Sequence, residues 1–148
     1  MINVPNTTTT IGTYAFYNCT NATTITIGTG VTTIGKSAFA NCSKVGEINF
    51  NAKKLTTTLD YNSPIFKNIG AEQDDITVTF GSSVEEIPEY LFYAGSTNSI
   101  YIELPISEIN FTEKEGGGYS CKKIGNYAFA SCAKVTELTI PSTVESIG

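Results

Sequence analysis

The chain has 148 residues, enough for one domain with a buried core, and 41% of them are hydrophobic. Its net charge of -5, from 14 acidic against 9 basic residues, argues against nucleic acid or an anionic membrane surface as partner, since both require a basic face. It contains no histidine, which removes the commonest general base and metal ligand, so we expect no enzyme and no cofactor.

The first unit that can be recognised is Thr10–Phe16, with the sequence TIGTYAF, and Cys19 follows it. The pattern returns as TIGKSAF at Thr33–Phe39, so that Ile34 lies 23 residues after Ile11. Self-similarity at a period of this length is typical of an array in which one supersecondary unit is stacked several times. The sequence therefore predicts a solenoid, with residues 1–148 forming a single domain of about five to six repeats.

Each unit also carries three apolar residues with the spacing i, i+3, i+5, which is the core pattern of a leucine-rich repeat. These trios are Ala22/Ile25/Ile27, Val45/Ile48/Phe50, Ile106/Ile109/Phe111 and Val135/Leu138/Ile140. The last two members alternate with polar residues, and Val78 and Phe80 show the same alternation. Alternation of this kind predicts a half-buried strand, so we expect every unit to add one short strand to a parallel sheet.

A turn rich in Gly, Pro, Ser or Asn follows the strand. Beyond this turn, the position directly after a recurring isoleucine is glycine in four units and Pro88 in a fifth. Because proline fixes φ near roughly -65°, this position does not require a positive φ. Pro88 and the residues after it read as the start of a short helix, so we expect one helical turn in each repeat. The phenylalanines of these turns are expected to form one interior column: Phe16, Phe39, Phe66, Phe92 and Phe129.

The middle units are longer than the regular period, because the later phenylalanines of this column are 27, 26 and 37 residues apart. Extra residues in a solenoid form loops, since each coil contacts only its neighbours. We expect these loops at residues 53–62, 68–75, 96–105 and 112–120. Within the third, Ser99–Leu104 alternates like a strand and predicts an edge pairing outside the regular sheet.

Ile34–Cys42 and Ile124–Cys132 both combine an Ile-Gly pair with Ala-Phe and then a cysteine three residues later. With the 23-residue period, this resembles the BspA-like leucine-rich repeats, also called the Treponema type. The resemblance implies a right-handed, curved solenoid. It also implies a bacterial or protist protein that is secreted or exposed at the cell surface, where family members act as adhesins for host matrix proteins or other cells. Units three and four depart from the pattern, since Asn68 or Ile69, and then Gly95, stand near the expected cysteine.

Met1 is not followed by a basic and then an apolar segment, so we expect the signal of an exported protein to have been removed or to lie outside this sequence. The apolar runs are far shorter than the roughly 20 residues that span a bilayer, so we expect no membrane insertion within this chain. Gly148 stands where the next Ala-Phe turn would follow, and we therefore expect the array to continue beyond it.

The four cysteines read as small buried hydrophobes, because Cys19, Cys42 and Cys132 share one phase of the repeat and Cys121 falls on a core position. Cys19 and Cys42 belong to adjacent units, so a disulfide bridge between them stays open as an alternative. A zinc site is disfavoured because no two cysteines lie close in sequence. The acidic clusters lack the spacing of a calcium loop, and a glycosidase would need one buried acid where exposed ones are expected.

The outward positions of the strands form the candidate binding site. If the strands align, one polar and mildly acidic surface contains Thr24, Thr26, Glu47, Asn49, Thr77, Thr79, Glu108, Asn110, Glu137 and Thr139. Tyr61, Tyr101 and Tyr119 near the loops are further candidates, because aromatic residues are favoured in binding hot spots. Solenoids use extended surfaces of this kind to bind partners. The alternative is a solvated face in which threonine serves only as a good strand former.

These observations favour a non-catalytic protein-binding or adhesion module, with a host surface or matrix protein as the partner that the resemblance implies. The alternative is a structural spacer that presents another domain of a larger surface protein. An enzyme is a third and weaker hypothesis, because no catalytic constellation can be recognised.

Overall fold

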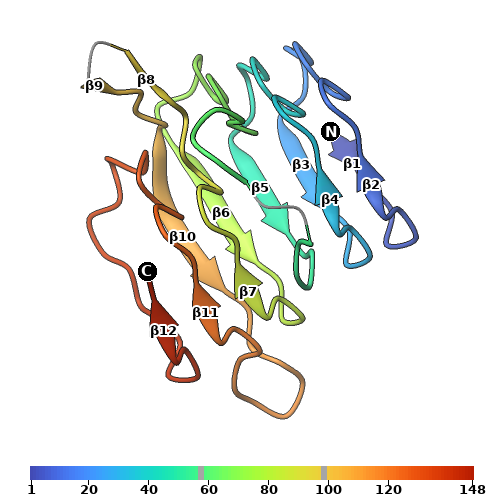
Figure 1. Ribbon diagram of the computed structural model, residues 1–148, viewed down its shortest axis with the longest axis vertical. Coiled ribbons are helices and arrows are strands. Elements are labelled where there is room, and N and C mark those ends of the chain that lie inside the picture. The colour runs from blue at the N-terminus through green and yellow to red at the C-terminus, as the bar shows by residue number, and fades with distance from the viewer. Residues whose placement is uncertain (57–58, 98–99) are drawn as a thin grey trace.

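The computed structural model describes residues 1–56, 59–97 and 100–148, with the backbone alone at 97, 100 and 101. Short strands joined by turns make up these ranges, and no helix within them could cross a membrane. The strands in Figure 1 are β1 (Ile2–Asn3), β2 (Thr10–Ile11), β3 (Thr24–Ile27), β4 (Thr33–Ile34), β5 (Glu47–Phe50), β6 (Ile76–Phe80), β7 (Glu86–Ile87), β8 (Ser96–Thr97), β9 (Ile100–Tyr101), β10 (Ile106–Phe111), β11 (Lys123–Ile124) and β12 (Ser146–Ile147).

Five of these strands form a parallel sheet in the order β1-β3-β5-β6-β10, which we call the first wall. Ile25, Ile48 and Val78 lie opposite one another in register and are fully buried. The residues between the inward positions are exposed or half-buried, as the alternation predicted. One short parallel strand per repeat is therefore confirmed for the units that contribute β3, β5, β6 and β10.

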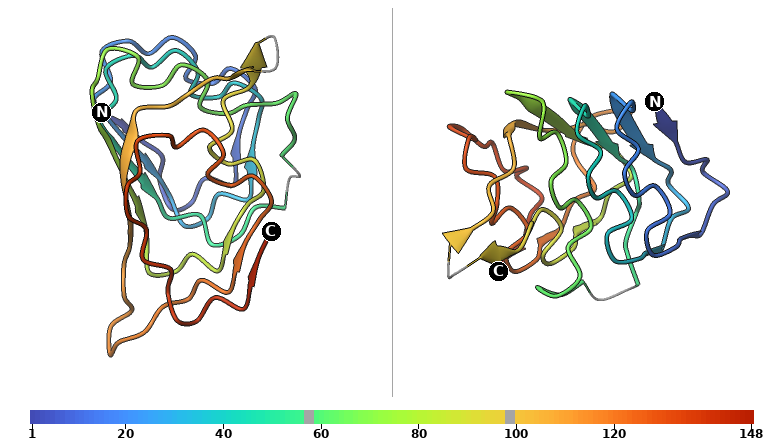
Figure 2. Two further views of the ribbon diagram at one scale, coloured as in Figure 1. Left: turned by 90° about the vertical axis from the view of Figure 1, so that its left-hand side faces the viewer. Right: turned by 90° about the horizontal axis from the view of Figure 1, so that it is seen from above.

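The opposite side of the coils, which we call the second wall, contains two smaller parallel sheets, β2-β4 and β7-β11-β12. The views in Figure 2 place the two walls on opposite sides of the interior. Between β4 and β7, the intervening coil adds no strand to this wall in its described residues. Its backbone still links the sheets, because the Thr56 N–H donates to the Thr32 carbonyl and the Glu85 N–H to the Lys53 carbonyl, each at 2.8 Å.

A short antiparallel pair lies outside both walls. In it β8 pairs with β9, with Ser96 opposite Tyr101 and Thr97 opposite Ile100. The edge pairing expected from Ser99–Leu104 is thus present at Ile100 and Tyr101, while Ser99 lies outside the described residues.

The interior column of phenylalanine rings is confirmed for all five of its members. Successive ring centroids from Phe16 to Phe129 are 5.3, 5.5, 5.3 and 6.4 Å apart, with interplanar angles of 7°, 14°, 22° and 14°. The three middle rings are fully buried and the two end rings are half-buried. Because a stacked pair contributes about 0.5–1.5 kcal/mol beyond its buried area, the column helps to hold each coil to the next.

The helical turn that we expected in each repeat is wrong. Two successive β-turns replace it in the first unit, where the Ala15 N–H donates to the Gly12 carbonyl. The second turn closes when the Tyr17 N–H donates to the Tyr14 carbonyl. Tyr14 has φ of 57° and Asn18 has φ of 62°, values that a right-handed helix does not contain. The same left-handed conformation recurs at Ser37, Asn41, Asn68, Tyr90 and Tyr127.

The other N–H groups of these turns donate to the neighbouring coil. The N–H groups of Tyr14, Phe16 and Asn18 donate to the carbonyls of Lys36, Ala38 and Ala40 at 3.0, 2.8 and 2.9 Å. Adjacent coils are therefore hydrogen-bonded through their turns as well as through their strands. Repeated coils of parallel strands without helices, within the part of the chain described, fit a repeat solenoid.

The recurring glycine position reflects the close approach of neighbouring coils. A Cβ atom at Gly35 would overlap the backbone of Gly12 and Thr13 in the coil before it. A Cβ atom at Gly125 would likewise overlap the backbone of the preceding coil. Neither glycine has a positive φ, as Pro88 indicated. Pro88 is accommodated because it borders a groove of about 300 Å³, beside the described part of the preceding coil that forms no strand in this wall.

The strand expected at Leu138 and Ile140 is absent, and β10 is the last strand of the first wall. The physical reason lies in the outward residues. A strand in register with β10 would place Glu137 directly opposite Glu108, and like charges opposite each other destabilise a strand pair.

Candidate binding face

Eight of the ten predicted face residues lie in two rows across β3, β5, β6 and β10. The strand registers place Thr24, Glu47, Thr77 and Glu108 in one row, and Thr26, Asn49, Thr79 and Asn110 in the other. All eight are exposed or half-buried, because the residues that alternate with them fill the core. We call this set the polar face.

Hydrogen bonds within the polar face repeat every second strand. The Glu47 carboxylate accepts a bond from the Thr24 hydroxyl at 3.4 Å and one from the Asn49 amide at 2.9 Å. Two strands later, the Glu108 carboxylate accepts from the Thr77 hydroxyl at 3.1 Å and from the Asn110 amide at 3.1 Å. A carboxylate has about four acceptor positions, so each glutamate keeps about two for a donor outside the chain.

The charge of the polar face is not balanced by lysine. The ion pairs found among the described residues join Lys53, Lys54, Lys122 and Lys123 to glutamates at positions 85, 86 and 145. None of these pairs includes Glu47 or Glu108, whose strands are two apart and therefore separated by about 10 Å. The polar face thus carries two oriented and uncompensated carboxylates, and it can accept hydrogen bonds from cationic or amide donors.

Glu137 and Thr139 are exposed but belong to no strand, so they do not extend the two rows. They line a hollow of about 650 Å³ beside β10, together with Glu108, Asn110 and Tyr119. Burial of the phenol and its hydrogen bond to Glu113 raise the pKa of Tyr119. The structure therefore places Tyr119, a candidate near the loops, in the hollow at the end of the polar face.

Tyr61 lies elsewhere. Its side chain is 62% exposed and borders a second hollow of about 620 Å³, on the side of the coils where the turns lie. The side chain of Tyr101 lies outside the described residues. The tyrosine candidates are thus not gathered at one site.

Sequence reasoning missed a polar ladder in the hollow that Tyr61 borders. The Asn68 amide donates to the Asn41 side-chain oxygen at 3.0 Å, and the Asn41 amide donates to the Tyr17 hydroxyl at 2.9 Å. The two asparagines follow their column phenylalanines by two residues, as Asn18 does, so the repeat phase could have revealed them.

One comparison with known proteins decides the family. The sequence model of the BspA type leucine rich repeat region matches residues 1–114 and 117–148, in six copies. The chain belongs to the BspA-type leucine-rich repeat family. No curated protein and no solved structure is detectably similar to it.

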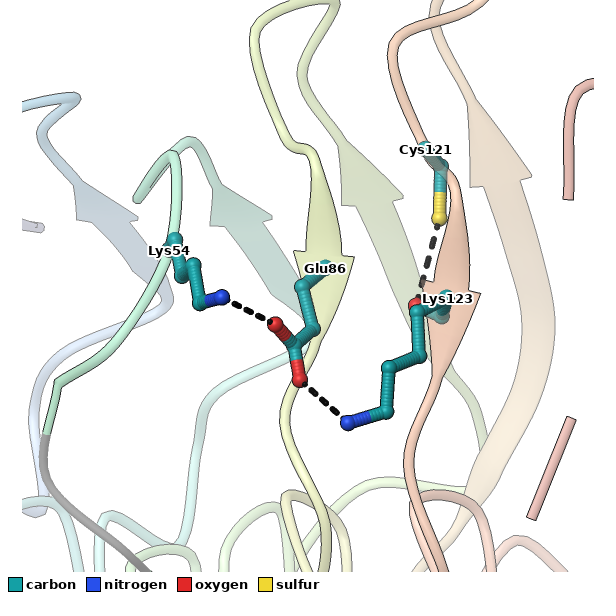
Figure 3. Close-up of polar contacts among 4 residues, drawn as sticks. All are labelled: Lys54, Glu86, Cys121 and Lys123. Carbon is teal, nitrogen blue, oxygen red and sulfur yellow. Dashed lines mark hydrogen bonds and ion pairs between the residues drawn. The ribbon is translucent and has the colours of Figure 1, made fainter. Parts of the chain in front are cut away.

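The second wall of this BspA-type chain carries a charged network across three coils. The Glu86 carboxylate lies 3.0 Å from the Lys54 ammonium and 2.9 Å from the Lys123 ammonium (Figure 3). Partial burial alone would raise the pKa of Glu86, but the two lysines outweigh it and hold the pKa below its ordinary value. The network joins Lys54, in the coil whose described residues add no strand to this wall, to β7 and β11.

The cysteines of this BspA-type chain are free thiols, so Cys19 and Cys42 do not form the bridge that the sequence left open. The Cys42 thiol donates to the Phe16 carbonyl at 3.2 Å. Burial raises the pKa of Cys42 to about 11 and that of Cys132 to about 12, so both stay protonated at neutral pH. No group of three Cys, Asp or Glu side chains suited to a metal ion occurs within the described ranges.

Proposed function

We propose that this chain is a non-catalytic protein-binding module whose polar face contacts the partner. The observation that supports this best is the arrangement of Glu47 and Glu108, each held by a threonine of the preceding strand and an asparagine of its own. Solubility alone needs exposed polar side chains and does not need carboxylates fixed in a repeated geometry. Fixed side chains lose less conformational entropy when a partner binds.

The chemistry of the polar face favours a protein partner that offers lysine, arginine or amide donors. The face is acidic, and the whole chain has a net charge of -5, which disfavours nucleic acid. Leucine-rich repeat arrays commonly serve as interaction modules, and their extended strand surfaces suit partners larger than a small ligand.

The setting that we propose is the bacterial surface or the extracellular space, with a host matrix protein as partner. The support is the family, whose members are commonly surface proteins involved in adhesion. Family analogy alone does not fix the function of a fold, so this step needs a direct test.

The test measures binding of the chain to purified collagen, fibronectin and laminin by biolayer interferometry. The Glu47→Gln/Glu108→Gln double variant keeps the shape of both side chains and removes two charges. We expect it to weaken binding at least tenfold, because charge-assisted hydrogen bonds are about twice as strong as neutral ones. The matched control is Glu103→Gln/Glu115→Gln, which removes two exposed charges outside the polar face and should bind like the unmodified chain.

Two results would contradict the proposal. Equal loss of binding in both double variants would indicate a general charge effect and no contact at the polar face. Failure of the unmodified chain to bind any of the three matrix proteins would instead favour the role of a structural spacer.

A further inference from the structure

The two edges of the first wall differ in length. At one edge, β1 contains only Ile2 and Asn3, and a short edge strand gives little template for pairing. At the other, β10 runs from Ile106 to Phe111, with an irregularity between Ile106 and Glu108 and regular pairing beyond it. No described strand covers the outer side of β10.

The free backbone groups of this edge can be assigned. The Thr112 N–H donates to the Phe80 carbonyl of β6 at 2.9 Å. In a parallel pair the N–H and C=O of one residue point to the same side, and successive residues alternate. Asn110 therefore faces β6 together with Thr112, while Ile109 and Phe111 direct their N–H and C=O groups to the open side.

The segment that should cover β10 stands away from it while both of its flanks are attached. The Ser131 N–H donates to the Phe92 carbonyl of the preceding coil at 3.2 Å, and the Glu145 N–H donates to the Lys122 carbonyl at 2.8 Å. Figure 1 shows the chain beyond β11 running beside β10 before it reaches β12. The hollow of about 650 Å³ lies between this segment and β10, and we call it the edge slot.

Charge explains why the chain does not close its own slot. The apolar trio of β10 is Ile106/Ile109/Phe111, and the last trio of the chain is Val135/Leu138/Ile140. If the two trios were paired in register, Leu138 would lie opposite Ile109 and Glu137 opposite Glu108. Earlier in the same row, threonine and glutamate alternate, so each carboxylate has hydroxyl neighbours. Glu137 breaks that alternation and sets one carboxylate against another, which is unfavourable at neutral pH.

We propose that the edge slot binds an extended segment of a partner protein, which adds to β10 as a new strand and places a lysine or arginine between Glu108 and Glu137. The neighbouring residues of that segment would be apolar, because Phe111 and Ile140 line the slot and are only half-buried. Main-chain hydrogen bonds to Ile109 and Phe111 supply affinity, and the two carboxylates supply selectivity. This contact shares Glu108 with the polar face but differs from it in using the backbone of the sheet edge.

A peptide built from this chain provides the probe. Residues 76–80 pair with β10 on its inner side, with Thr77 opposite Glu108, so the same sequence suits the outer side. A capped, fluorescent peptide of residues 76–80 with Thr77→Lys should bind the 148-residue chain at least tenfold more tightly than the matched peptide with Thr77→Glu. The chain variant Glu137→Gln should reduce this preference at least threefold, and Glu47→Gln, which lies on the polar face, should leave it unchanged.

Hydrogen exchange followed by NMR locates the contact. The lysine peptide should slow exchange of the Ile109 and Phe111 amides at least tenfold and leave the Asn110 amide unchanged, because that amide already faces β6. This pattern would support strand addition whatever the outcome of the matrix-protein experiment, since the polar face requires no protection of these amides.

Three results would overturn the proposal. Protection of the Ile109 and Phe111 amides in the free chain at low concentration would show that its own segment closes the slot. Protection that grows with chain concentration would assign the slot to a second copy. Equal affinity of the lysine and glutamate peptides would remove the role of the two carboxylates.

Discussion

The two walls of the coil respond differently to the extra residues of the middle repeats. In the first wall, the registers of β5, β6 and β10 stay aligned, although column phenylalanines of the neighbouring units are up to 37 residues apart. In the second wall, the described residues of one coil form no strand, and a groove opens beside Pro88. The additional residues are thus placed where they leave the polar face continuous.

The contacts that hold the walls also differ. The first wall is paired strand to strand over a buried apolar surface, whereas the interrupted part of the second wall is bridged by exposed lysines around Glu86. Surface ion pairs contribute less than core packing. We therefore expect changes in the shared interior to have the largest effect on stability and changes at the Glu86 network the smallest.

The largest effect is expected from the phenylalanine column, which both walls share. Phe66→Ala removes a fully buried ring that stacks on two others and should lower the free energy of unfolding by about 3–5 kcal/mol. Guanidinium denaturation measures this loss, and Phe66→Leu provides a milder variant if the alanine variant does not fold. The exposed Tyr61→Ala serves as control and should change stability by less than about 0.5 kcal/mol. Similar values for Phe66→Ala and Tyr61→Ala would show that the column is not a common core.

An intermediate effect is expected from the spacing of the coils. Gly35→Ala forces a methyl group against the backbone of the coil before it and should cost about 1–3 kcal/mol. The matched control is Gly12→Ala in the same repeat phase, where a Cβ meets no atom within 4 Å, and its effect should stay within about 0.5 kcal/mol. Thermal unfolding of the two variants measures the difference. Equal melting temperatures would mean that the coils can move apart at little cost.

The smallest effect is expected at the Glu86 network. Glu86→Gln should lower the free energy of unfolding at pH 7 by about 1 kcal/mol or less. Because the pKa of Glu86 is depressed in the folded chain, this stabilisation is present above the unfolded pKa of about 4.3 and is lost as pH falls through the folded pKa. Urea denaturation from pH 7 to pH 3 should therefore show the variant and the unmodified chain converging in acid. A difference that stays constant with pH would assign the effect to packing.

Much of this architecture follows from the spacing of apolar residues. The alternation around Ile25, Ile48 and Val78 is sufficient to predict the first wall, because burial on one face fixes both the strand and its register. The phase of the Ala-Phe pair is likewise sufficient to predict the column of rings. The glycine position at Gly35 could be recognised, but its cause, the backbone of the adjacent coil, becomes visible only in three dimensions.

Two expectations failed because they depended on information that local sequence does not contain. Pro88 and the residues after it resemble a helix start, yet Tyr14 and Tyr90 adopt left-handed conformations that tertiary hydrogen bonds between coils impose. The last trio has the correct spacing for a strand, but spacing does not show which charges meet across a sheet. Glu137 opposite Glu108 is such a case. Because this strand does not form, Glu137 and Thr139 are missing from the face, which has eight residues where ten were predicted.

The alternation of threonine and glutamate across four strands defines a length scale for recognition. Equivalent carboxylates recur after every second coil, so a ligand aligned with one of them can be displaced along the sheet only in steps of about 10 Å. An array with this rule offers half as many equivalent docking positions as it has coils. The number of partners that such an array can bind, and the positions to which a bound partner can shift, therefore depend on the number of repeat pairs.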